Sequence, residues 1–178
     1  MAIVIMAIFS YSFQSIQGAL FLSIAHGITS PGLFICAGIL YDRFHTRTII
    51  YYRGITIYMP LFSIIFFIFT LANMATPLTG NFIGEYLCFL GIFNQNPILA
   101  ILASLSIILV AAYSIWFYNR VVFGSYSLFF KPTFDLTYLE FSLLLPLLLS
   151  IIFLGIFPNI LLDIVEFSLS ISLPTINI

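Results

Sequence analysis

Charged residues are scarce in this chain. Only five Lys or Arg and six Asp or Glu occur among 178 residues, whereas 62% of the residues are apolar. An average soluble domain is about 45–50% apolar and about 25% charged, so these few charges cannot cover a surface in water. The composition excludes a soluble globular protein and predicts an all-α, polytopic membrane protein, because spanning backbone must satisfy its own hydrogen bonds.

Other scarcities exclude further classes. The net charge of −1 provides no basic surface for nucleic acid. The two cysteines, Cys36 and Cys88, are too few for a disulfide framework or a four-ligand metal site, and we expect them to be buried apolar residues. No nucleophile with a base, no phosphate-binding glycine loop and no metal-ligand spacing is found. We therefore expect no redox centre, cofactor site or metal site in this chain.

Apolar stretches follow one another along the sequence. Residues 1–13 would form a helix of about 20 Å, which is shorter than the roughly 30 Å hydrocarbon core, so we expect only part of a helix there. Residues 17–41, 98–119 and 139–162 are each long enough to cross once. A tail, residues 163–178, follows the last of them.

The stretch of residues 56–93 is too long for one straight crossing. As a single helix it would extend about 57 Å, nearly twice the required length. Its middle reads Thr76-Pro77-Leu78-Thr79-Gly80-Asn81, where proline lacks a backbone donor and glycine favours non-helical geometry. The alternatives are a hairpin that crosses twice and a broken helix that crosses once.

The basic residues favour the broken helix. They lie in the loops after the second and fourth apolar stretches: Arg43, Arg47, Arg53, Arg120 and Lys131. One crossing places all five on the same side of the membrane, whereas two crossings divide them three against two, contrary to the positive-inside rule. We predict a single membrane domain, residues 1–178, whose basic loops face the cytoplasm or its mitochondrial equivalent, the matrix.

Two ionisable side chains, Glu85 and His26, lie within the predicted spans and away from their ends. An acidic residue at the centre of a span raises the free energy of membrane insertion, and such residues usually mark an ion or proton path. Glu85 follows the break by one helical turn, and unwound backbone within a membrane usually lines protein or water. A histidine titrates near neutrality and can pass a proton along a water chain. The predicted site has a proton path and a broken-helix loop: Glu85 and His26, with Thr76, Pro77, Gly80 and Asn81.

Simpler interpretations of these residues stay open. Glu85 could only hydrogen-bond the broken helix and remain protonated, and His26 could only pack beside Gly27. We expect the small hydroxyl residues Ser104, Ser106 and Ser114 to pack between helices rather than to line water.

Four segments of the sequence resemble a known family. Residues 26–34 (HGITSPGLF), 40–47 (LYDRFHTR), 71–85 (LANMATPLTGNFIGE) and 111–124 (AAYSIWFYNRVVFG) resemble the late region of the antiporter-like subunit 4 of mitochondrial respiratory complex I, NADH:ubiquinone oxidoreductase. That family has about fourteen helices in two inverted repeats, each with a broken helix. The resemblance implies that residues 56–93 are the broken twelfth helix. It also places Glu85 on the acidic residue of the outward half of a proton path and His26 on the histidine of the central polar axis.

The resemblance implies a function in the respiratory chain. The chain would be a fragment of a proton-translocating membrane-arm subunit of NADH:ubiquinone reductase, in the mitochondrial inner membrane, carrying the exit part of one proton path. FMN, iron–sulfur clusters, NADH and ubiquinone would bind elsewhere in the complex, and the partners would be other membrane-arm subunits and lipids. The alternatives are a subunit of a multi-component sodium/proton antiporter and a non-pumping scaffold.

Two departures from the family pattern stand out. A usual subunit is more than twice as long, so we expect a split gene and a companion chain that supplies the N-terminal helices. The alternative is a truncated chain. Pro31 stands where relatives usually have a small residue, near His26.

Overall fold

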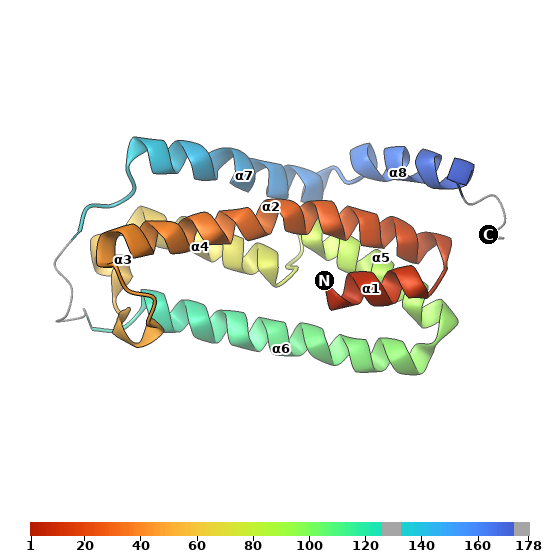
Figure 1. The fold of residues 1–178 in the computed structure, drawn as a ribbon, viewed down its shortest axis with the longest axis horizontal. Helices are drawn as coiled ribbons and strands as arrows, with labels where there is room; N and C mark the ends of the chain where they lie inside the picture. The colour runs from red at the N-terminus through yellow and green to blue at the C-terminus, as the bar shows by residue number, and fades with distance from the viewer. Residues whose placement is uncertain (126–132, 173–178) are drawn as a thin grey trace.

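The protein consists of helices that run along one long axis (Figure 1). The computed structural model describes residues 1–125 and 133–172, and every regular element within them is helical. The elements are α1 Ala2–Phe9, α2 Phe13–Phe44, the 3-10 turn η1 Ile49–Tyr51, α3 Ile55–Tyr58, α4 Pro60–Asn73, α5 Gly80–Gln95, α6 Pro97–Val122, α7 Tyr138–Ile156 and α8 Asn159–Ser172. The predicted all-α membrane fold is confirmed, since α2, α6 and α7 are each long and apolar enough to cross a membrane.

Helix α2 is the central element and runs the length of the molecule, with α4 and α5 beside it and α7 and α8 along another side (Figure 1). It has 32 residues and contains the whole predicted span 17–41. The Ser12 side chain caps its first turn by accepting a hydrogen bond from the Ser15 amide, and the helix continues through Pro31. It ends at Phe44, and the next residue, His45, closes the last turn with a left-handed backbone (φ 50°).

Helices α4 and α5 are the two halves of the broken helix. They follow one another along α2, with the break at residues 74–79 near the middle of the molecule (Figure 1). Two non-glycine residues in the break, Ala75 (φ 51°) and Leu78 (φ 77°), adopt left-handed backbone that a helix cannot contain. The predicted broken helix is therefore confirmed, and both halves run in the same direction along the axis.

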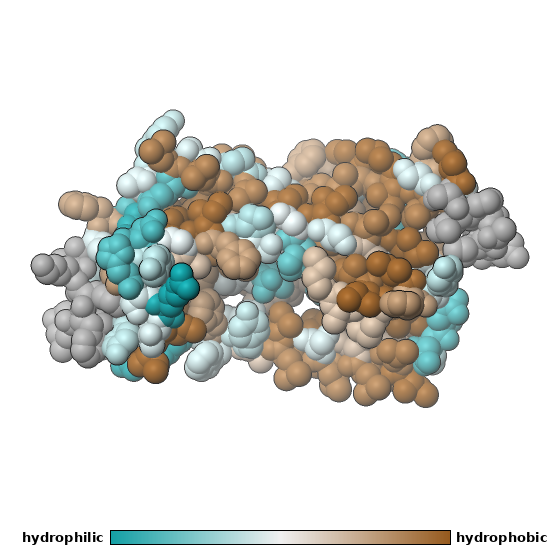
Figure 2. Space-filling view, in the orientation of Figure 1, coloured by the Kyte–Doolittle hydropathy of each residue, from teal (hydrophilic) through white to brown (hydrophobic). Residues whose placement is uncertain are grey.

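The described basic residues gather at one end of the molecule. The C-terminal ends of α2 and α6 and the η1–α3 connection lie together there (Figure 1), and hydrophilic surface covers that end (Figure 2). Arg43 forms an ion pair with Glu140 at 2.7 Å and donates a second hydrogen bond to the Asp135 carbonyl at 3.0 Å. These bonds join the end of α2 to the start of α7. Lys131 lies outside the described residues.

The C-terminal apolar stretch forms two helices where the sequence suggested one span over residues 139–162. Helix α7 ends at Ile156, and Pro158, which lacks a backbone donor, precedes the start of α8. Helix α8 carries Asp163 and Glu166 of the predicted tail and packs against α2, where the Gln17 amide donates to the Leu162 carbonyl at 3.3 Å. Residues 173–178 of that tail lie outside the described residues.

The outer surface is largely apolar. Helix α6, for example, exposes a row of large aliphatic side chains: Ile101, Leu102, Leu105, Ile108 and Leu109. Such a surface is stable only against lipid or another apolar surface. The core lies mainly toward the basic end, where Phe62, Phe66 and Phe69 of α4 are buried against α2.

Candidate functional site

The site lies where α5 packs against α2, and glycines bring the two backbones into contact. A Cβ atom at Gly84 would lie 2.8 Å from the Leu22 Cα, and a Cβ at Gly18 would lie 2.7 Å from the Cys88 amide nitrogen. Since such distances are too short for any side chain, only glycine fits at these positions. The helices are antiparallel, because Gly80 at the start of α5 lies against Ala25.

Asn81 connects the break to α2. Its side chain is 3% exposed, and its amide nitrogen donates to the Ala72 carbonyl of α4 at 2.9 Å and to the Thr29 hydroxyl of α2 at 3.3 Å. The Ala72 carbonyl, at the end of α4, also accepts a hydrogen bond from the Ala75 amide at 3.1 Å, so the Asn81 amide provides its second bond. The Asn81 side-chain oxygen is buried and accepts no hydrogen bond from the described part of the chain.

The other predicted loop residues hold the break in place. The Thr79 hydroxyl donates to the Thr76 carbonyl at 2.7 Å, and the Thr76 hydroxyl donates to the Leu71 carbonyl at 3.1 Å. Pro77 is exposed. On the other side of the break, the Leu78 backbone rests directly on Gly155 of α7, where no side chain would fit.

Glu85 and His26 are both half-buried, on the two helices that the glycines bring together. The contacts of neighbouring residues show where each of the two lies along the helix axes. Ala25 lies beside Gly80, and Leu22 lies beside Gly84. Glu85 thus lies about one turn farther from the break than His26. Within residues 1–125 and 133–172, neither side chain takes part in a hydrogen bond or ion pair. Glu85 is therefore not a structural bonding partner of the break in this arrangement.

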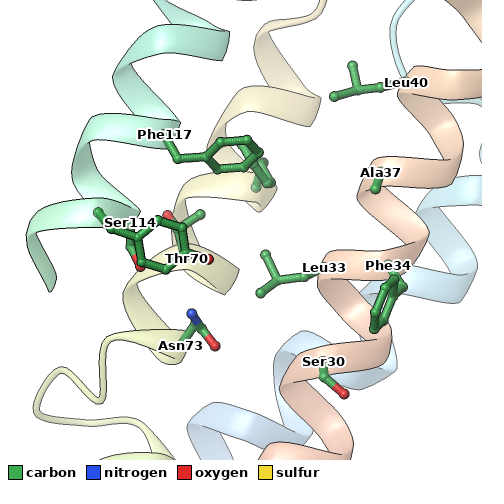
Figure 3. A pocket seen from close by; sticks show the side chains of 11 residues that line it. Ser30, Leu33, Phe34, Ala37, Leu40, Thr70, Asn73, Ser114 and Phe117 are labelled. Carbon is green, nitrogen blue, oxygen red and sulfur yellow. The ribbon is translucent and has the colours of Figure 1, made fainter. Parts of the chain in front are cut away.

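Further polar residues line a cavity of about 260 Å³ between α2, α4 and α6 (Figure 3). Thr70 and Asn73 of α4, Ser30 of α2 and Ser114 of α6 line its inner end, beside the break. Ser114 is 3% exposed, and its hydroxyl has no hydrogen-bond partner among the described residues. Ser104 and Ser106 instead donate to carbonyls of their own helix.

The sequence reasoning did not single out Thr29, Thr70 or Asn73. Thr29 lies one turn after His26, and Asn73 directly precedes the break, so helical spacing from the two named features was the available signal. In the described part of the chain, no three His, Cys, Asp or Glu side chains gather as a metal site would require. Cys36 and Cys88 are both buried and free.

Comparison with known proteins identifies the family. The family described as NADH:quinone oxidoreductase/Mrp antiporter, transmembrane, matches residues 1–110. NADH-ubiquinone oxidoreductase chain 4 of Mycosarcoma maydis is 58% identical over 96% of this chain and 35% of its own length. NADH-quinone oxidoreductase subunit M of Rhodobacter capsulatus is 42% identical over 93% of this chain and 32% of its own length. The chain thus spans about a third of the length of the curated relatives that it matches.

A solved structure agrees with the sequence relatives. A chain of respiratory complex I from Thermus thermophilus with bound NADH superposes with a TM-score of 0.85 at 31% identity, covering 93% of this chain and 36% of that chain. The resemblance to subunit 4 of complex I that the sequence motifs indicated is confirmed. The chain belongs to the NADH:quinone oxidoreductase/Mrp antiporter transmembrane family.

Proposed function

We propose that this chain forms the exit part of one proton path in a membrane-arm subunit of NADH:ubiquinone oxidoreductase. The observation that carries the proposal is Glu85, a half-buried acid one turn beyond the anchored break, on a helix whose backbone touches α2. An acid without a bonding partner inside a membrane bundle is free to take up and release a proton as nearby charges change.

In this proposal the chain's own residues move and hold the proton. Protons arrive from the rest of the subunit, pass through water and the His26 imidazole to the Glu85 carboxylate, and leave on the side opposite the basic loops. The free oxygen of Asn81 supplies a buried acceptor for a water molecule beside the break. Electron transfer through FMN and iron–sulfur clusters, from NADH to ubiquinone, takes place on other subunits and acts on Glu85 electrostatically.

We further propose that the chain lies in the mitochondrial inner membrane with its basic loops in the matrix. The matched relatives are about three times as long, and a companion chain would supply their remaining helices. Those helices and other membrane-arm subunits would cover part of the exposed apolar surface. The gathering of Arg43, Arg47, Arg53 and Arg120 at one end supports this orientation.

Replacement of Glu85 by Gln tests the proton path. Glu85→Gln keeps the size of the side chain but cannot release a proton, so we expect normal assembly of the complex and a loss of proton-coupled turnover of about tenfold or more. Glu166→Gln, which removes an exposed acid of α8, is the matched control and should leave turnover unchanged. Full proton pumping in Glu85→Gln would overturn the role of Glu85.

The family description also names the Mrp antiporter, and the second candidate is a subunit of a multi-component sodium/proton antiporter. Proton movement that depends on sodium and continues without NADH oxidation would favour it. A scaffold role would instead be indicated if variants of Glu85 and His26 were both silent while loss of the chain prevented assembly.

A further inference from the structure

The first half of the broken helix begins without a capping side chain of its own. Met59 occupies the N-cap position of α4, which Ser, Thr, Asp or Asn usually takes, and its side chain makes no capping hydrogen bond. Pro60 has no backbone donor, and the Ser63 amide donates to the Met59 carbonyl at 3.1 Å. The amides of Leu61 and Phe62 are therefore the donors of this first turn that need an acceptor from elsewhere.

Asp135 supplies that acceptor from a distant part of the sequence. Its carboxylate oxygens accept hydrogen bonds from the Leu61 amide at 2.9 Å and from the Phe62 amide at 3.2 Å, which lie 74 and 73 positions away. The negative charge of a carboxylate also complements the positive end of the helix dipole. Asp135 thus caps α4, although it lies in the connection between α6 and α7.

Arg43 holds the backbone of Asp135 in place. Its guanidinium donates to the Asp135 carbonyl at 3.0 Å, to the Glu140 carboxylate at 2.7 Å and to the Met59 sulfur at 3.2 Å. Glu140 in turn closes the first turn of α7 in a capping box with Thr137. The end of α2 and the starts of α4 and α7 lie at the same end of the molecule (Figure 1), and one arginine and two acids join them.

Helix α4 is consequently held at both ends by side chains that are distant in the sequence. Its start is bonded to Asp135, and its last turn is bonded to Asn81 through the Ala72 carbonyl at 2.9 Å. The 14 residues of the helix form a rod of about 21 Å. Apolar packing along its side is non-directional, whereas these hydrogen bonds fix where its two ends lie. A shift at the Asp135 end would reach the break, because a helix moves as a rigid element.

We propose that Asp135 is a positioning residue for the broken helix. By capping α4 from the α6–α7 connection it fixes the axial position of that helix, and through Ala72 and Asn81 it sets the geometry of the break. Its consequence for proton transfer at Glu85 rests on the proposed function, whereas its effect on the break does not.

Hydrogen exchange in the assembled complex, followed by mass spectrometry, tests this inference. Asp135→Ala removes the cap, so we expect the amides of residues 60–63 to exchange about fivefold faster, the factor that corresponds to the typical loss of one N-cap. The amides of Met74, Ala75 and Thr76 donate to carbonyls of the last turn of α4. Because the inference links the two ends of α4, exchange at these three amides should also become faster.

Control variants separate positioning from a general loss of stability. Asp42→Ala removes an exposed acid at the end of α2 and should leave exchange unchanged at both ends of α4. Asp135→Asn keeps an oxygen that can cap a helix and should restore most of the protection. In every variant, residues 103–112 in the middle of α6 should exchange as in the wild type.

The inference is overturned if Asp135→Ala leaves residues 74–76 as in the wild type, if Asp135→Asn exchanges as fast as Asp135→Ala, or if exchange rises equally in residues 103–112. If Asp135→Ala does not assemble, Arg43→Gln decides. That variant releases the Asp135 carbonyl and should speed exchange at both ends of α4, and unchanged exchange there would overturn the inference. Full proton pumping in Glu85→Gln would overturn the proton path alone and leave the exchange result as it is.

Discussion

The side-chain amide of Asn81 donates hydrogen bonds to the Thr29 hydroxyl at 3.3 Å and to the Ala72 carbonyl at 2.9 Å. One side chain at the start of α5 thereby holds both the end of α4 and the middle of α2. The proposed proton path depends on this junction, because Glu85 and His26 lie on the two helices that it joins.

Replacing Asn81 by Leu should destabilise the junction. Both hydrogen bonds are lost, and the Ala72 carbonyl keeps only its bond from the Ala75 amide; at about 0.5–1.5 kcal/mol for each bond, we expect a loss of about 1–3 kcal/mol of stability. Thr29→Val removes only one of the two bonds and should have a smaller effect. The measurement is the temperature at which this chain dissociates from the complex, followed by native gels. Equal dissociation temperatures for Asn81→Leu and wild type would contradict the junction.

His26 variants separate a proton relay from a packing residue. His26→Gln retains hydrogen bonding but cannot carry a proton near neutral pH, and His26→Leu retains only bulk. A relay predicts that both variants assemble and lose about tenfold or more in proton-coupled turnover. If His26→Leu pumps normally, the side chain serves only to fill space beside Gly27.

The contact between α5 and α2 should not tolerate even a methyl group. Gly84→Ala would place a Cβ 2.8 Å from the Leu22 Cα, so the helices must separate. We expect a cost of about 1–3 kcal/mol and reduced assembly on native gels. Gly27→Ala, on the partner helix α2, places a Cβ in open space and is the matched control. Similar assembly of both variants would show that the helices are not in backbone contact.

The Arg43–Glu140 ion pair should be worth more than an exposed surface pair. Its side chains are only 12% and 24% exposed, and the N···O distance is 2.7 Å. A double-mutant cycle with Arg43→Gln and Glu140→Gln should give a coupling free energy of about 1.5–3 kcal/mol, as for hydrogen bonds to charged groups. Thermal stability is the readout, and Arg53→Gln serves as the control for loss of charge at this end. If the two substitutions lower stability additively, the ion pair does not link α2 to α7.

The broken helix was predictable from the sequence, whereas its anchoring was not. Pro77 and Gly80 in an overlong apolar stretch indicate a break by local backbone chemistry alone. The Asn81–Thr29 bond joins residues 52 positions apart, and nothing local specifies such a pairing.

The division of the last apolar stretch illustrates a different failure. Pro158 was visible in the sequence, but the hydropathy around it is uniform, and the span was therefore predicted across it. Apolar composition indicates residence in the membrane, but it does not indicate whether the backbone remains helical. In this case the missing backbone donor of proline determined where α7 ends.

The glycine contacts between α2 and α5 limit how the protein can work. Rotation of either helix about its own axis would bring a side chain into the space that only glycine fits. The two helices are therefore expected to behave as one rigid unit. In the proposed proton path, uptake and release would then proceed through side-chain rotations, rearranging waters and small adjustments at residues 74–79. In this proposal the backbones of α2 and α5 stay fixed relative to each other, and the largest movement on this chain is the rotation of a side chain such as the Glu85 carboxyl group.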